Sequence, residues 1–319
     1  MAAEVGVAAV EGARAVHRGG AFGEEGAPRG AERPPRPNAA LALAALGTSP
    51  ALRADGRSPL EFRPLSLAPA AGALEGGFAV EAELGATRAL GCCSAELGEP
   101  SPGRPAEGSL EVRVELSPMA SGAFEPGRGR PAQAEAEARL TRLLERSLRE
   151  RRAVELESLC ESPGRCAWAL RLDVRVLDHG GALADAAAAA ALAALLAFRL
   201  PQVSREPGGA FRAHPLEERE GRPLTVHRLP VAVSFAALQN AGGRKILLAD
   251  PSAEEEALSG GARAVFSVDN ARQVTVHAGG GERVWRRPSR AFGEGGGGKG
   301  GRGDRDGEKD GGGAREVAG

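Results

Sequence analysis

Two segments of the chain alternate between apolar and mostly charged residues, and this alternation constrains the fold more than any other feature. Residues 109–116 read SLEVRVEL, and residues 168–176 read WALRLDVRV. Successive side chains of a strand point to opposite faces, so each segment predicts a strand with one buried face and one solvated face. Half-solvated strands of this kind are typical of antiparallel sheets.

Helices are predicted between and after these strands. Residues 139–150, RLTRLLERSLRE, carry leucine at helical spacing, and an alanine-rich helix over 183–198 ends before Pro201. Residues 38–46, NAALALAAL, could form a further short helix.

The second half of the chain returns to strand patterns after a stretch, 201–221, that is predicted to be a loop. Residues 223–238 and 244–250 are rich in Val, Ile and Leu, and residues 262–278 predict a hairpin that turns at Asp269-Asn270. The order of strands and helices favours a layered α+β fold.

Composition divides the chain into four parts. Residues 1–46 are predicted to be a disordered arm, and residues 282–319 a disordered glycine-rich tail, because neither offers enough apolar surface to offset its ordering entropy. Between them we expect a first folded half over 50–200 and a second over 222–281.

Charge and cysteine content limit the possible functions. The formal net charge is -1, so any contact with nucleic acid must come from a local basic patch. The four cysteines match neither a zinc site nor a redox pair and predict reduced thiols. The five histidines are scattered without metal or triad spacing, and the longest apolar stretch, 186–198, is too short to cross a membrane.

The helix predicted at 139–150 has one apolar face and one cationic face. Its leucines share one arc, and its arginines gather on the opposite side. The apolar set is Leu140, Leu143, Leu144 and Leu148, and the cationic set is Arg139, Arg142, Arg146 and Arg149. A solvated face with ion pairs, Glu135 to Arg139 and Glu145 to Arg149, is one interpretation. A row of guanidinium groups that follows successive phosphates is the other.

Six segments, in this order, resemble the RNase PH-like ring subunits of the RNA exosome, and most closely the non-catalytic kind. They are RADGRSPLEFRPL, TRALGCCSAEL, GRPAEGSLEVRVELSPMASGAFEPGR, LTRLLERSLRERRAVELESLC, CAWALRLDVRVLDHGGALADAAAAAALAAL and LLADPSAEEE. The resemblance implies two βαβ-type layers, similar to the second domain of ribosomal protein S5. The helices that end the fold in that family are not predicted in residues 282–319.

The resemblance also implies which residues contact RNA. In that family the helix after FEPGR presents arginines to RNA, which nominates Arg142, Arg146 and Arg149. The loop PSPGRPAEG resembles a channel-lining loop and nominates Arg104, and Arg128 lies in the FEPGR turn itself.

Active members of this family cleave RNA by phosphorolysis and need a phosphate cradle with carboxylates, usually with Mg²⁺. Asp250 and Glu256 keep the acidic pair at the family's spacing, but FEPGRGRPAQ lacks the hydroxyl residue of the cradle. We therefore expect no catalytic residue, no metal and no cofactor. The alternative is an active phosphate-dependent 3′-to-5′ exoribonuclease that uses Asp250 and Glu256 with Mg²⁺ and inorganic phosphate.

The resemblance thus implies a non-catalytic, RNA-binding subunit of a hetero-hexameric ring. Its partners would be RNA, other RNase PH-like subunits and cap subunits with RNA-binding domains, with no membrane. Its tasks would be 3′-to-5′ RNA processing and degradation, including rRNA maturation and mRNA decay, in the nucleus, nucleolus and cytoplasm. A scaffold that no longer contacts RNA is a third possibility.

Overall fold

The computed structural model describes residues 37–47, 51–70, 77–124, 130–207, 209–239, 243 and 245–278. All of them belong to one compact unit, Met1–Val284. The predicted tail at 282–319, and most of the predicted arm at 1–46, lie outside the described residues. The short helix expected at 38–46 is confirmed as α2, Pro37–Leu46.

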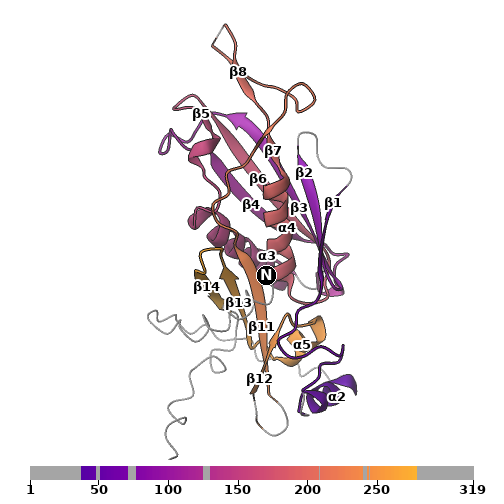
Figure 1. The fold of residues 1–319 in the computed structure, drawn as a ribbon. Helices are drawn as coiled ribbons and strands as arrows, with labels where there is room; N and C mark the ends of the chain where they lie inside the picture. Colours follow the sequence, from indigo (N-terminus) through magenta and orange to yellow (C-terminus); the bar gives the residue numbers. More distant parts are fainter. Residues whose placement is uncertain are drawn as a thin grey trace, which may run out of the picture. The chain divides into compact units, whose positions relative to one another are not determined.

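The first sheet is built around the two alternating segments (Figure 1). Its path is β1 (Leu65–Pro69), β2 (Phe78–Leu84), β3 (Thr87–Gly98), β6 (Cys166–Asp178) and β4 (Ser109–Leu116), with β5 (Cys160–Ser162) also paired to β6. Buried and exposed residues alternate along the whole of β4. Val112 and Leu172 are paired neighbours in the core, so the predicted inward faces are confirmed.

The sheet is mainly antiparallel, as expected, but β4 and β6 run parallel. The chain leaves β4 and crosses through α3, Arg130–Glu145, before it enters β6. Parallel neighbours require such a crossover, and a helix usually supplies it. This pair therefore forms a βαβ unit, which alternation alone does not distinguish from a hairpin.

The alanine-rich helix is α4, Leu183–Ala197, and it packs against the first sheet and against strand β11, Val231–Gln239, of the second sheet. Eight of its residues are buried, seven of them alanines, so its backbone comes very close to β3. At Gly91 on β3, a Cβ atom would lie 2.4 Å from the carbonyl oxygen of Ala190. The contact therefore requires glycine at this position.

The second sheet has the order β12 (Lys245–Ala249), β11 (Val231–Gln239), β13 (Arg263–Val268) and β14 (Val274–Ala278). The hairpin predicted at 262–278 is confirmed by the pairing of β13 with β14. Strands β12 and β13 lie on opposite sides of β11, and helix α5, Ala253–Leu258, connects them along the chain. Both strands are antiparallel to β11, so they run parallel to each other and form a second βαβ-type unit.

The prediction of a loop at 201–221 is wrong in part. Two short strands, β8 (Val203–Arg205) and β9 (Phe211–Ala213), pair as a hairpin there. They follow a two-residue pairing of β7 (Arg199–Leu200) with β10 (Arg222–Pro223). These strands are too short for the alternation of residues to be visible in the sequence.

The remaining expectations concern cysteines and membranes. All four cysteines are free, with Cys93 and Cys166 buried. No helix in the described part of the chain is long and apolar enough to cross a bilayer.

Candidate functional site

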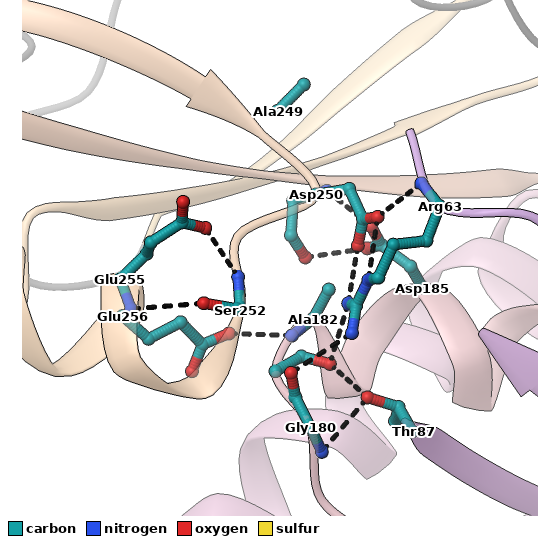
Figure 2. Close-up of polar contacts among 12 residues, drawn as sticks. Arg63, Thr87, Gly180, Ala182, Asp185, Ala249, Asp250, Ser252, Glu255 and Glu256 are labelled. Atoms are coloured by element: carbon teal, nitrogen blue, oxygen red, sulfur yellow. Dashed lines mark hydrogen bonds and ion pairs between the residues drawn. The ribbon is translucent and has the colours of Figure 1, made fainter. Parts of the chain in front are cut away.

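The acidic residue Asp250 lies at the end of β12, where it is fully buried and held by several hydrogen bonds (Figure 2). Its Oδ1 accepts a bond from Nη2 of Arg63 at 2.6 Å. Its Oδ2 accepts from Nη1 of Arg57 at 3.0 Å and from the backbone N and Nε of Arg63 at 2.8 and 2.9 Å. Each carboxylate oxygen has about two acceptor positions, so Oδ2 is fully engaged and both oxygens are bound to arginine. The backbone of Asp250 has a positive φ of 47°.

Arg63 ties this carboxylate to the first half of the chain. Beyond Asp250, its guanidinium donates to the carbonyl of Gly180 at 3.0 Å and to that of Gly181 at 3.3 Å. These glycines form the turn that leads from β6 into α4. A Cβ at Gly181, whose φ is +101°, would lie 2.3 Å from the carbonyl oxygen of Pro251, so the two halves meet backbone to backbone here.

The second acidic residue, Glu256, lies in α5 and is also engaged. Its Oε1 accepts from the backbone N of Ala182 at 2.8 Å, and its Oε2 pairs with Arg263 at 2.7 Å. Glu255 beside it completes a capping box with Ser252 and forms an ion pair with the buried Arg53. The six-residue spacing therefore places both acids in one region, but each is held by a different set of donors (Figure 2).

Asp185, in the first turn of α4, is a further carboxyl group in this region that sequence reasoning missed. It is partly buried and accepts bonds from the backbone N and the Oγ of Ser234 at 2.9 and 2.6 Å. Burial raises the pKa of Asp185 to about 8, against the effect of the Ser234 bonds and with a further upward push from the charges of Asp250 and Glu256. The group is therefore mostly neutral at pH 7.

This arrangement does not fit the Mg²⁺ and phosphate of a phosphorolytic centre. Both oxygens of Asp250 are bound by arginine, so a metal ion on this carboxylate would lie beside the positive guanidinium groups of Arg57 and Arg63, which repel it. Within the described residues no group of three His, Cys, Asp or Glu side chains has the geometry to hold a metal ion. The cluster can join the two halves of the fold, and no catalytic step follows from its geometry.

The arginine row lies on α3 and on the π-helical turn that continues it, Arg146–Glu150. The predicted apolar face is buried, with Leu144 and Leu148 almost completely covered. Arg142, Arg146 and Arg149 are exposed.

The ion pairs of this row are long. Arg146 lies 3.7 Å from Glu150, and Arg149 lies 3.6 Å from Glu145. Arg142 donates to the carbonyl of Ala138 at 3.1 Å and, among the described residues, has no carboxylate within ion-pair distance. Exposed pairs of this kind contribute little, so the guanidinium groups remain free to bind an anion.

The two other nominated arginines do not join the row through any described contact. Arg104 lies in the turn between β3 and β4, with its side chain 69% exposed and Glu107 at 3.3 Å. Arg128 lies outside the described residues.

His179 is an example of a histidine with a structural role. Its ring stacks on Phe124 with centroids 5.7 Å apart, and its Nδ1 accepts from the backbone N of Gly181. Sequence patterns also missed the arginines that hold Asp250, because Arg57 and Arg63 lie almost 200 residues away from it. The only signal was the segment RADGRSPLEFRPL, which carries them.

Comparison with known proteins agrees with this architecture. Residues 61–201 match the model of the 3′ exoribonuclease family, domain 1. The chain is 43% identical to exosome complex component RRP45B of Arabidopsis thaliana over 209 residues, which are 65% of this chain and 45% of that protein. It is 38% identical to exosome complex component Rrp42 of Thermococcus kodakarensis over 226 residues, 70% of this chain and 77% of that protein.

A solved structure shows the same fold. The exosome of Archaeoglobus fulgidus with RNA bound to the active site is matched with a TM-score of 0.60 and 30% identity, over 76% of this chain and 87% of that one. The chain spans about half the length of most of the curated plant and animal relatives that it matches.

Proposed function

The chain belongs to the RNase PH-like 3′ exoribonuclease family, and from this premise we propose that it is a non-catalytic, RNA-contacting ring subunit of an RNA exosome. The similarity to proteins named exosome components supports the assembly. The geometry of the acidic pair supports the lack of catalysis, and the arginine row supports the contact with RNA.

The observation that carries the proposal is the state of Asp250. Freeing this carboxylate for a metal would leave the guanidinium group of Arg63 without its carboxylate partner, while Arg57 would keep Asp55 at 2.6 Å, and breaking a buried pair costs about 3–5 kcal/mol. A group held in this way is suited to joining the two halves of the subunit. Phosphorolysis, where the assembly performs it, then belongs to a neighbouring subunit.

The arginine row supplies the second half of the proposal. Guanidinium groups bind phosphates through paired hydrogen bonds and stay charged at every physiological pH. Arg142 and Arg146 are one turn apart on an exposed helix face, so both could contact one strand of RNA. We expect them to bind the backbone without reading its sequence.

The partners follow from the same premise. We propose other RNase PH-like subunits as ring neighbours, cap subunits with RNA-binding domains on the ring, and work in rRNA maturation and mRNA decay in the nucleus, nucleolus and cytoplasm. Identification of the proteins that co-purify with the tagged chain tests this set directly.

The test of catalysis uses the assembled ring with RNA and inorganic phosphate, and measures release of nucleoside diphosphates. Asp250→Asn removes the charge of the carboxylate and keeps its shape, and Glu254→Gln is the control, because Glu254 is an exposed residue of the nearby helix α5. We expect the same rate per assembled ring for both variants and the parent protein. Product release that disappears with Asp250→Asn alone, while the ring still assembles and binds RNA, would show that this subunit is catalytic.

A further inference from the structure

The end of the arginine helix forms a shallow hollow with the second sheet. Its lining includes Ser147 and Arg151 from the helix end, Arg228 from the segment before β11, and Ser267, Gln273 and Thr275 from the β13–β14 hairpin. Ser147 is buried and donates to the carbonyl of Leu143 at 2.8 Å, inside the π-helical turn. Single π-helical turns in α-helices occur frequently at functional sites.

Positive charge in this hollow is only partly neutralised. Arg151 donates to Oε1 of Gln273 at 3.1 Å, and Arg228 donates to the same neutral oxygen at 2.7 Å. Asp269 pairs with Arg228 at 2.9 Å, and it is the only acidic residue of the lining. Arg146, one turn before the end of the helix, lies 3.7 Å from Glu150.

A histidine lies beside the hollow with one nitrogen unsatisfied. His277 and Thr275 point to the same face of β14, two residues apart. Nε2 of His277 is buried and has no hydrogen-bond partner among the described residues. Burial, together with the charges of Arg146 and Arg151, lowers the pKa of His277 to about 4, while Glu150 acts in the opposite direction.

Helix C-termini normally repel anions, because their last carbonyl groups are unpaired. Here two of those carbonyls are capped by the chain itself. The backbone N of Arg152 donates to the carbonyl of Arg149 at 3.0 Å, and that of Ala153 donates to the carbonyl of Leu148 at 2.9 Å. Because these carbonyl groups are capped, the helix end repels an anion less strongly. The attraction from Arg151 and Arg228 can then prevail.

We propose that this hollow is a phosphate subsite that continues the arginine row and binds a phosphodiester of RNA between Arg151 and Arg228, close to His277. The inference rests on the proposed contact between RNA and the arginine row. The anion would compensate the charge of Arg151, which has only a neutral amide oxygen as its partner, and would share Arg228 with Asp269. The hydroxyl of Thr275 is a further donor in the lining. His277 would then gain a negative partner and bind a proton more readily.

The first test measures RNA affinity of the assembled ring as a function of salt. We expect Arg151→Gln to weaken binding of an oligoribonucleotide about tenfold, as for the loss of one charge-assisted hydrogen bond. The slope of log affinity against log salt should fall by about 0.7, the value for one phosphate of a single strand. Arg151→Lys should keep the slope, and Arg212→Gln, an exposed change on β9, should alter neither quantity.

The outcomes separate this inference from the proposed function. If Arg142→Glu weakens RNA binding and Arg151→Gln does not, the subsite is wrong and the function of the row stands. If neither change weakens binding, both proposals are wrong.

The second test follows the ring of His277 by NMR titration of the full chain. Addition of the oligoribonucleotide should raise the pKa of His277 by at least about one unit, and chloride at equal ionic strength should not. A rise with inorganic phosphate but not with RNA would mean that the hollow binds the free anion and would overturn the proposal. The absence of any rise would also overturn it.

Discussion

Arg63 and Asp250, 187 residues apart, form a buried ion pair in which two guanidinium nitrogens of the arginine contact both oxygens of the carboxylate, at 2.6 and 2.9 Å. The pair joins the segment before β1 to the end of β12 and also reaches the turn that starts α4. The pair thus lies where it stabilises the joint between the two sheets.

Loss of this pair should destabilise the subunit strongly. We predict that Arg63→Met lowers the free energy of unfolding by about 3 kcal/mol, the lower end of the cost of breaking a buried pair, because Asp250 stays buried with Arg57 as its remaining charged partner. Arg88→Met removes an arginine that pairs with Glu81 and Asp178 at the surface, with its side chain 46% exposed, and should cost much less stability than Arg63→Met. Urea unfolding of the two variants compares them, and equal losses would contradict the structural role of Arg63.

The raised pKa of Asp185 predicts how the stability of the fold depends on pH. The pKa of this carboxyl group is about 8 in the folded chain, against an ordinary value of 3.8. Between pH 3.8 and pH 8 the folded state therefore binds a proton that the unfolded state does not bind. The contribution is fully present below the lower pKa and is lost as pH rises through the folded pKa. Asp185→Asn keeps both bonds to Ser234, with the amide nitrogen as donor to Oγ.

Asp185→Asn cannot ionise, so this variant should not lose stability in this way as the pH rises. Unfolding measured at pH 6, 7.5 and 9 should show that the parent protein loses stability relative to Asp185→Asn as the pH rises. Parallel profiles for the two proteins would show that Asp185 is ionised in the fold.

The contact between α4 and β3 predicts a matched pair of glycine variants. Gly91→Ala places a methyl group 2.4 Å from the carbonyl oxygen of Ala190, which only a backbone shift can relieve, and should cost about 1–3 kcal/mol. Gly98→Ala adds the same group on the same strand where nothing lies within 4 Å, and should be neutral or slightly stabilising. Thermal unfolding distinguishes the two, and an unchanged midpoint for Gly91→Ala would mean that the helix is not as close to the strand as described.

Sequence patterns predicted the local parts of this fold well. Alternation identified Val112 and Leu172 as core residues, and helical spacing identified Leu144, because periodicity records which face is buried. It could not show that β4 and β6 run parallel, since alternation is the same in both directions. The link between Arg63 and Asp250 was also invisible, because no local pattern connects residues 187 apart. The arginine row was visible as a stripe, but its ligand was suggested only by a family resemblance.

Charge reversal of the arginine row tests the central claim most directly. In the assembled ring, Arg142→Glu with Arg146→Glu should weaken RNA binding and reduce the salt slope by about 1.4, as expected for two phosphate contacts on a single strand. Arg205→Glu with Arg212→Glu, two exposed changes on the β8–β9 hairpin, should leave affinity and slope as they are. If the row variant binds RNA with the parent's affinity and slope while the ring remains intact, this subunit does not contact RNA through α3.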